Sequence, residues 1–332
     1  MPADVIPGAE GWAAAGGPAG ALVVHGFTGT PATVRPVAEA LVDAGFSVAV
    51  PRLPGHGTAI ADMVPTRFTD WSTAVEDAYV TLARSCSRVV VVGQSMGATL
   101  ACRLAARHPE IAGVVAVNPL VEPVDPELKE LVRLLLDAGE VVGDGAGRDL
   151  ADPSATDIAY RGSPLAAALS LYEALDDLRP ELARIACPVL IITSAEDHVV
   201  PPRNSDSLAA LVHGPVERLR LERSYHVATL DHDKDLLAAR TWPSSAGSPR
   251  ERAAQEGERR RSPGRPSKRW WRVERRMRLW CKTVAAMRAS AVWMPAARRR
   301  RPARSATARS MGSSGNEPSS RRSFSSSARA PA

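Results

Sequence analysis

Short apolar runs alternate with amphipathic segments from the N-terminus to about residue 240. The apolar runs lack polar alternation, which is typical of strands buried on both faces of a sheet, and they cover residues 21–24, 46–50, 88–92, 111–117 and 188–193. A further strand is expected at VERLRLE, residues 216–222. Segments with helical spacing lie between the strands, over residues 31–44, 71–84, 96–107 and 203–213. This alternation predicts an α/β fold with a mostly parallel central sheet and right-handed crossovers.

One interval, residues 119–185, breaks the alternation because it is helical and acidic. Its two helical segments are ELKELVRLLLDAGE and SPLAAALSLYEALDDL, and a joint rich in glycine and aspartate, GDGAGRD, lies between them. An insertion of this kind between two sheet strands predicts a small helical cap over one edge of the sheet. The last helix of the domain is expected at DHDKDLLAAR, residues 231–240.

The charge of the chain divides into two unlike parts. The 332 residues have a net charge of +6. Residues 1–240 hold 19 basic and 31 acidic side chains, whereas residues 241–332 hold 23 basic and 5 acidic ones. We therefore expect an acidic globular domain over residues 1–240, without a nucleic-acid partner, and a separate basic tail.

The tail, residues 241–332, is rich in Arg, Ser, Pro and Ala and shows no period of 2 or 3.6 residues, so we expect it to be disordered. Two interpretations stay open. One is a basic arm that binds nucleic acid or anionic lipid surfaces, with WWRVERRMRLW as an interfacial helix. The other is the product of a shifted reading frame, because GC-rich DNA read out of frame encodes these residue types and the helix ending at Arg240 stops without a cap.

The cysteines and the N-terminus bear on the compartment. Cys86, Cys102, Cys187 and Cys281 form no CxxC pair and no metal-ligand spacing, so we expect reduced thiols, no metal site and a cytoplasmic protein. The start MPADVIPGAEGW lacks the basic and apolar segments of a signal peptide. No apolar stretch reaches the roughly 18 residues of a transmembrane helix.

The stretch GQSMG, residues 93–97, places a serine between two glycines at the end of a buried strand. It fits G-x-S-x-G at a strand-to-helix turn, a motif that lifts a nucleophilic serine clear of the sheet. Side chains at Gly93 or Gly97 are expected to collide with the neighbouring strand or helix. The N–H groups and dipole of the helix beginning at Met96 favour developing negative charge. Ser95 is therefore the candidate nucleophile.

A serine hydroxyl needs a base and an orienting carboxylate, and after such a motif the expected chain order is Ser, acid, His. Asp197 and Glu196 both follow strand 188–193, and we favour Asp197 because acid loops of related enzymes have the form of DHVVPP. Among the histidines we favour His226, which follows strand 216–222 directly. His198 adjoins the acid in sequence, which makes a triad hydrogen bond between the two side chains sterically awkward. His232 is expected to be a solvated residue of the last helix.

A tetrahedral oxyanion needs two backbone donors. One is the N–H of Met96, the residue after the nucleophile. The second is expected from the loop after strand 21–24, where Phe27 is the candidate. His25 in HGF and His56 in PGHGT are expected to brace their loops by hydrogen bonds rather than to react.

Six ordered motifs over about residues 10–240 resemble the bacterial monoacylglycerol lipases of the α/β-hydrolase superfamily: HGFTGTP, PRLPGHGT, FTDWSTAVEDAY, GQSMGATLA, EDHVVPPRN and SYHVATLDHDKDLL. The small carboxylesterases of the same group share most of them. The resemblance implies an α/β-hydrolase fold with a helical cap, a Ser95–His226–Asp197 triad and oxyanion donors at Phe27 and Met96. It also implies a cap that forms a tunnel for the acyl chain, with a small polar end for glycerol.

The sequence departs from that family at three places. A cap glutamate before an L-A-Y stretch contacts a glycerol hydroxyl in these lipases, whereas here the shorter Asp157 precedes Ile158-Ala159-Tyr160. Asp157 is thus a substrate-binding candidate. Because its side chain is shorter than glutamate, whether the protein selects glycerol esters stays open. The stretch GDGAGRDL is longer than the family's usual turn. The family's C-terminal helix is lost after Leu237, so we expect an under-covered apolar sheet face and reduced stability.

These features predict a serine ester hydrolase that acts on a monoacylglycerol of medium or long chain, a small-molecule ester, and needs no metal or organic cofactor. A generic short- or medium-chain carboxylesterase is the first alternative. The second alternative is a serine aminopeptidase or a haloperoxidase of the same fold, because a fold does not fix the chemistry. A binding protein that uses the basic tail is the third.

Overall fold

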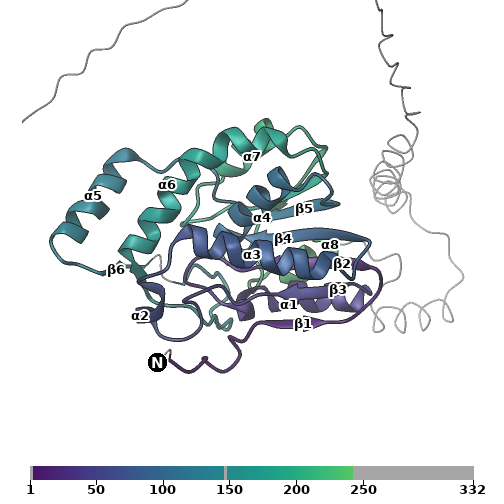
Figure 1. Ribbon diagram of the computed structural model, residues 1–332, viewed down its shortest axis with the longest axis horizontal. Coiled ribbons are helices and arrows are strands. Elements are labelled where there is room, and N and C mark those ends of the chain that lie inside the picture. Colours follow the sequence, from purple (N-terminus) through teal and green to yellow (C-terminus); the bar gives the residue numbers. More distant parts are fainter. Residues whose placement is uncertain (1–2, 146–147, 242–332) are drawn as a thin grey trace, which may run out of the picture. The chain divides into compact units, whose positions relative to one another are not determined.

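The computed structural model describes residues 3–145 and 148–241, so the expectations for the basic tail lie outside the described residues. Its centre is a seven-stranded sheet of order β1-β3-β2-β4-β5-β8-β9 (Figure 1). The pairs are parallel except β1–β3, which is antiparallel, and this confirms the predicted sheet. The strands are β1 (Trp12–Ala14), β2 (Ala19–Val24), β3 (Ser47–Val50), β4 (Arg88–Gln94), β5 (Gly113–Val117), β8 (Val189–Ser194) and β9 (Val216–Leu221).

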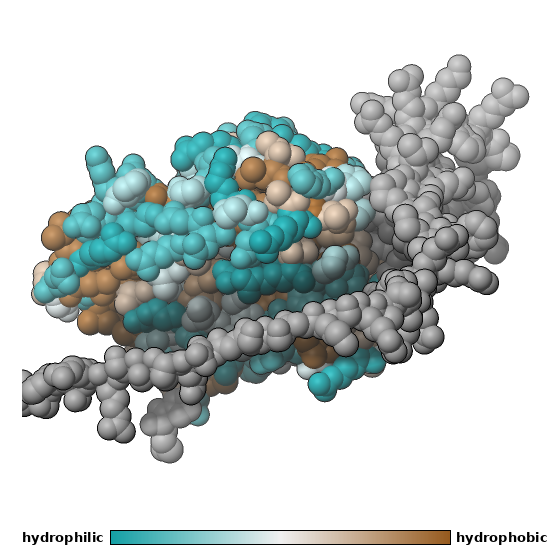
Figure 2. Space-filling view, turned by 45° about the horizontal axis from the view of Figure 1, so that its top comes forward, coloured by the Kyte–Doolittle hydropathy of each residue, from teal (hydrophilic) through white to brown (hydrophobic). Residues whose placement is uncertain are grey.

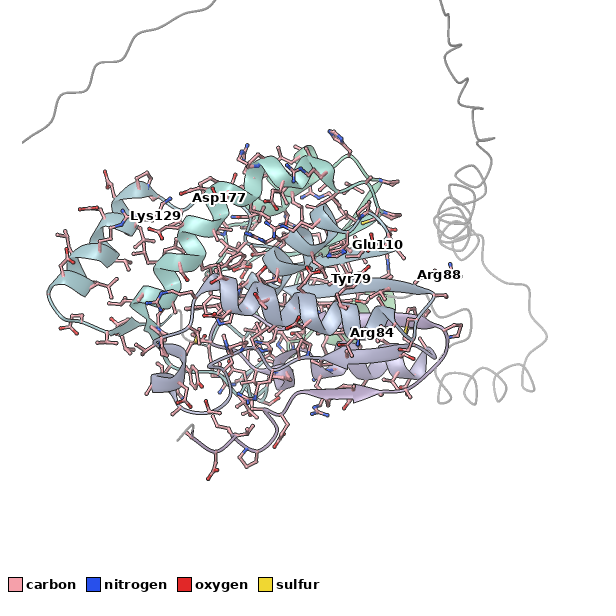
Figure 3. The ribbon with its side chains drawn as sticks, viewed as in Figure 1. Tyr79, Arg84, Arg88, Glu110, Lys129 and Asp177 are labelled. Atoms are coloured by element: carbon pink, nitrogen blue, oxygen red, sulfur yellow. The ribbon has the colours of Figure 1, made fainter. Side chains whose placement is uncertain are left out.

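Helices cover both faces of the sheet. One face carries α1 (Pro31–Asp43) and α8 (Lys234–Thr241), whose buried residues join those of the strands in one apolar cluster. The other face carries α3 (Phe68–Ala83), α4 (Met96–Arg107) and α7 (Arg203–Leu211), with Trp71 of α3 fully buried in the second cluster. Tyr79 Oη of α3 donates to Glu110 Oε1 (3.0 Å) beyond the end of α4, and Figure 3 labels both.

Helix α4 is buried nearly all round, since only Arg103 and Arg107 are not among its buried residues. It is rich in small residues, which let it lie close to the sheet. Arg107, in its last turn, reaches Glu181 of the cap (3.2 Å). The helix that follows Ser95 is therefore a rigid support, fixed by packing on several sides.

The interval between β5 and β8 forms the cap. It contains α5 (Pro126–Asp137), the antiparallel strands β6 (Val142–Asp144) and β7 (Gly162–Pro164), α6 (Leu165–Glu181) and a 3₁₀ turn, η1 (Leu182–Arg184). Asp125 caps α5 by accepting the N–H of Glu127 (2.9 Å). Lys129 of α5, labelled in Figure 3, pairs with Asp176 of α6 (2.7 Å). Apolar side chains gather on the cap at the left of Figure 2 and include Leu128, Leu131 and Leu134, which are 42–58% exposed.

The structure differs from the sequence-based expectation in its shortest elements. The predicted small helical cap also contains β6 and β7, and neither β1 nor α2 (Ile60–Met63) was predicted. A period of 2 or 3.6 residues cannot be recognised in three or four residues. His232 was expected inside the last helix, but α8 begins after it, and only its predicted exposure is correct. Among the described residues, no helix has both the length and the apolar character needed to cross a membrane.

Candidate active site

The turn between β4 and α4 holds Ser95 in an uncommon backbone conformation. Its φ is 56° and its ψ is −120°, values that a residue with a side chain adopts only when its surroundings enforce them. A Cβ on Gly93 would lie 2.1 Å from Gly97 O, and a Cβ on Gly97 would lie 2.2 Å from Val24 O. The collisions expected from the sequence are therefore present, because strand, turn and helix approach to backbone contact.

The candidate acid and base meet in a short hydrogen bond. His226 Nδ1 lies 2.8 Å from Asp197 Oδ2, and their side chains are 8% and 1% exposed. Asp197 Oδ1 accepts the N–H groups of Val199 (2.9 Å) and Val200 (2.7 Å), which fixes the carboxylate while Oδ2 faces the ring. Glu196, the alternative acid, is exposed.

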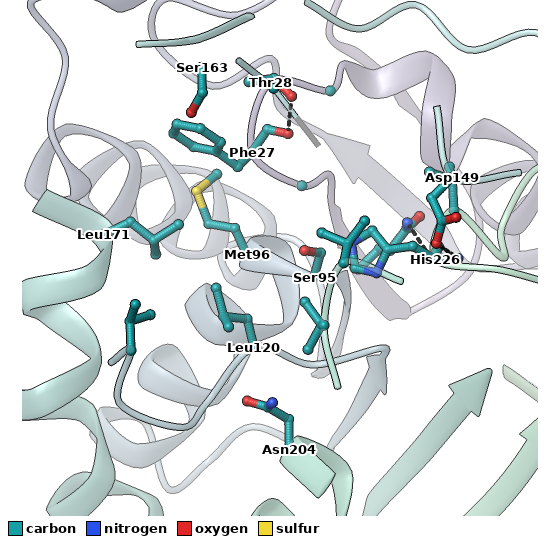
Figure 4. Close-up of a pocket in the computed structure, with 18 of the residues that line it drawn as sticks. Phe27, Thr28, Ser95, Met96, Leu120, Asp149, Ser163, Leu171, Asn204 and His226 are labelled. Atoms are coloured by element: carbon teal, nitrogen blue, oxygen red, sulfur yellow. Dashed lines mark hydrogen bonds between the residues drawn. The ribbon is translucent and has the colours of Figure 1, made fainter. Parts of the chain in front are cut away.

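Ser95 and His226 line the same pocket, which has a volume of about 440 Å³. Figure 4 shows the two side chains next to each other. Within the described residues the Ser95 hydroxyl and the His226 ring are not joined by a hydrogen bond. Such bonds are often long in ligand-free hydrolases and tighten when substrate binds.

The main chain of His226 is held from two sides. Its carbonyl oxygen accepts from Asn118 Nδ2 (2.8 Å) and Gln94 Nε2 (3.1 Å). Its N–H donates to Asp149 Oδ2 (3.0 Å). None of these three partners was singled out from the sequence. Asn118 has a φ of 44°, and an asparagine just after a strand was the only available hint, since asparagine tolerates this region better than most residues.

The candidate oxyanion donors Phe27 and Met96 both line the pocket. Met96 is the first residue of α4, so its N–H has no acceptor within the helix. The loop that carries Phe27 continues into Thr28, whose φ is 60°. Thr28 O accepts the N–H of Tyr160 (3.0 Å) from the cap, and this contact holds the loop in its strained form.

His25 and His56 brace the neighbouring loops, as expected. His25 Nε2 accepts the N–H of Leu53 (3.2 Å), and its Nδ1 lies 2.9 Å from Gly26 O. His56 Nδ1 lies 3.0 Å from Pro54 O. Burial, reinforced by the neighbouring His56, lowers the pKa of His25 to about 3. Burial also lowers the pKa of His56 to about 4. Both rings are therefore neutral near pH 7 and act as hydrogen-bonding struts.

The two competing histidines lie elsewhere. His198, with a side chain 59% exposed, directs Nδ1 at Asp149 Oδ1 (2.7 Å). The hydrogen bond to Asp149, aided by the same negative charge, raises the pKa of His198. His232 is exposed. Only His226 therefore combines the contact to Asp197 with a place in the pocket beside Ser95.

Asp157 also lines the pocket, with its side chain only 8% exposed. Its Oδ1 lies 3.4 Å from Arg148 Nε, a partner that the sequence did not predict. The same pocket is also lined by apolar side chains, which include Phe27, Met96, Leu120 and Leu171 (Figure 4). In the described part of the chain, no group of three or more His, Cys, Asp or Glu side chains could hold a metal ion.

Known proteins resemble both the sequence and this arrangement. The profile of the alpha/beta hydrolase family matches residues 21–240. A thermostable monoacylglycerol lipase from Bacillus sp. (strain H-257) is 42% identical over 71% of this chain and 94% of its own length. A carboxylesterase from Bacillus subtilis (strain 168) is 25% identical over 67% of this chain and 90% of its own.

A solved structure from a study of LipS and LipT, two metagenome-derived lipolytic enzymes, has a TM-score of 0.69 and 38% identity to this chain. It covers 72% of this chain and 97% of its own. These relatives confirm the predicted fold and the predicted class of reaction, carboxylic ester hydrolysis, on a small-molecule ester. The chain belongs to the alpha/beta hydrolase family.

Proposed function

We propose that the protein hydrolyses monoacylglycerols of medium or long acyl chain to glycerol and a fatty acid, and that residues 1–240 are its catalytic domain. The observation that carries the proposal is the 2.8 Å contact between Asp197 and His226, whose ring lines the same pocket as Ser95 at its strained turn. We assign the reaction to the cytoplasm, because Cys86, Cys102 and Cys187 are free thiols.

In the proposed mechanism, Ser95 Oγ attacks the ester carbonyl while His226 accepts its proton. Asp197 holds Nδ1 of the ring and stabilises the imidazolium that forms. The oxyanion accepts the N–H groups of Phe27 and Met96. His226 then returns the proton to the departing glycerol oxygen, and a water molecule activated by His226 releases the fatty acid from Ser95 in the second half of the reaction.

The pocket is lined by both apolar and polar side chains, which fit the two halves of such a substrate. The apolar side chains Met96, Leu120 and Leu171 suit an acyl chain that leaves water. Asp157 is our candidate for accepting a glycerol hydroxyl, and its position opposite Arg148 means that the two partners compete for its oxygens. The 42% identity to a monoacylglycerol lipase supports this assignment over the short-chain carboxylesterase.

A fluorophosphonate probe followed by a substrate series tests the proposal. The probe should label Ser95, and Ser95→Ala should lose both the label and at least about 10⁴-fold of the activity. The wild-type kcat/KM should be highest on monoacylglycerols within a series from eight to eighteen carbons, and higher than on methyl esters of the same acids. A label at another residue, or faster cleavage of short esters or of a proline amide, would refute it.

A further inference from the structure

Asp149, in the cap connection between β6 and β7, contacts two catalytic loops at once. Its Oδ2 accepts the backbone N–H of His226 (3.0 Å) and that of His198 (3.1 Å), the residue directly after Asp197. Its Oδ1 lies 2.7 Å from His198 Nδ1. Its own carbonyl oxygen accepts the N–H of Val227 (3.1 Å). Figure 4 shows its side chain beside His226.

These contacts of Asp149 constrain the distance between Asp197, the proposed acid, and His226, the proposed base. One carboxylate oxygen is shared by the N–H of the base itself and by the N–H next to the acid, so it ties the two loops at their catalytic positions. Hydrogen bonds to an ionised carboxylate are shorter and stronger than neutral ones. The Asp149 side chain is only 11% exposed, so water competes weakly for these donors.

We propose that Asp149 is a positioning residue for the hydrolysis. It sets the spacing of the loops that carry Asp197 and His226, so that the ring meets the acid on one side and Ser95 on the other. Because Asp149 belongs to the cap, its side chain couples the arrangement of the cap to the geometry of the triad. The inference rests on the proposed roles of Ser95, Asp197 and His226.

His198 contributes to this positioning by contacting the other carboxylate oxygen of Asp149. Its ring keeps Oδ1 of Asp149 occupied and so directs Oδ2 at the two backbone donors. The charged and titratable groups around it are Asp149, Glu196 and Asp197, and its ring meets that of Tyr225 edge-on at 4.6 Å. An amide at position 149 can still accept from both N–H groups, but its NH₂ can face only a neutral His198 ring.

Three variants test the proposal through kcat and KM. Asp149→Ala should lower kcat about 30- to 100-fold with KM within about twofold, because a displacement of about 1 Å at the base is costly while the substrate pocket stays intact. Asp149→Asn should retain most of kcat at pH 8.5, and its deficit relative to wild type should grow below about pH 6.5, where an unpaired histidine becomes protonated. His198→Ala should cost about threefold, and the double variant should be no worse than Asp149→Ala.

Asp152→Asn is the matched control. It removes one carboxylate charge from the same segment. Among the described residues its side chain accepts hydrogen bonds only from Ser154, so the variant should keep wild-type kcat. Folding of each variant is checked by circular dichroism and thermal unfolding. Wild-type kcat in a folded Asp149→Ala protein would overturn the proposal. If that variant does not fold, a deficit of Asp149→Asn that does not change with pH would overturn it instead.

The labelling rate of the fluorophosphonate probe separates this inference from the proposed function. It reports the reactivity of Ser95 with any phosphonyl electrophile and does not require the correct substrate. A wild-type protein that labels at Ser95 but ignores monoacylglycerols would refute the substrate and leave Asp149 testable by labelling rate. A labelling rate unchanged in Asp149→Ala would refute the positioning role alone.

Discussion

The turn that carries Ser95 and the loop that carries His226 are both held in a defined conformation, but by different interactions. The turn is fixed by close backbone packing at the two glycines that flank Ser95, because a Cβ on Gly93 would collide with Gly97 of the same turn and a Cβ on Gly97 would collide with Val24 of β2. The loop is fixed by side chains far away in sequence. Its contacts to Asp149 and Asn118 join residues 77 and 108 positions apart.

A second buried carboxylate makes the contrast sharper. Asp231, fully buried, accepts four backbone N–H groups: Ala151 (2.8 Å) and Asp152 (2.9 Å) in the cap, and Tyr225 and His232 (2.8 Å each) around the histidine. The proposed nucleophile is thus positioned by steric exclusion, whereas the proposed base is positioned by hydrogen bonds to buried charge. We expect the two regions to respond differently to substitution and to pH.

Gly93→Ala should produce the largest loss of stability, because it places a Cβ in the closely packed turn that carries Ser95. The new Cβ would meet backbone atoms of α4 at 2.1 and 2.3 Å, and backbone cannot rotate away as a side chain can. We expect a loss of about 3 kcal/mol or more in the free energy of unfolding, measured by chemical denaturation. Gly113→Ala is the control, because its Cβ meets only Pro188 O at 3.3 Å. Equal losses in both variants would contradict the steric account.

Asp231→Asn should produce the next largest loss of stability, because it disrupts the hydrogen bonds that hold the loop of His226. An amide keeps one oxygen and turns an NH₂ group toward two N–H donors, so two of the four contacts become repulsive. We expect a loss of about 2–3 kcal/mol in the free energy of unfolding, together with a lower kcat. Asp235→Asn, which neutralises an exposed carboxylate on α8, should change neither quantity. A fully stable Asp231→Asn would mean that the charge contributes nothing to the loop.

The same contrast explains what the sequence could predict. The turn at Ser95, the long strands and α1, α3 and α4 were predictable because their determinants are local: glycine spacing, valine runs and helical periodicity. The pairing of Asp197 with His226 was predicted from their places after two strands, together with the resemblance of the DHVVPP loop to the acid loops of related enzymes. Asp149 and Asp231 were not, because an aspartate in a polar segment has no local mark that distinguishes a solvated side chain from an anchor for a loop many positions away.

Acid should lower the stability of the protein through His25 and His56, which brace the loops near Phe27. His25 and His56 are neutral when folded, with pKa values lowered to about 3 and 4 chiefly by burial, whereas unfolded histidine titrates near 6.5. Below pH 6.5 the unfolded state therefore binds more protons, and stability falls as pH falls. His198 has the opposite sign, because its raised pKa favours the folded state at low pH, but it is exposed and its share is small.

We expect a loss of about 2 kcal/mol in the free energy of unfolding between pH 7.5 and 5.5, with a slope approaching two protons per molecule below pH 6.5. Urea denaturation across this range measures it. The variant His56→Gln should show a shallower slope than wild type because one of the two titrating rings is gone. A stability that does not change from pH 7.5 to 5.5 would exclude neutral histidines as the struts of this loop.

Asp157→Ala should give the smallest effect, because it alters the cap side of the pocket and leaves both catalytic regions in place. If Asp157 accepts a glycerol hydroxyl, the variant should raise KM for a monoacylglycerol two- to fivefold, about the value of one hydrogen bond that water partly replaces. KM for the methyl ester of the same acid should stay unchanged. Arg148→Gln frees Asp157 from its partner at 3.4 Å and should lower KM for the glycerol ester slightly. Parallel shifts for both esters would instead assign Asp157 to the shape of the cap, leaving glycerol recognition to other groups.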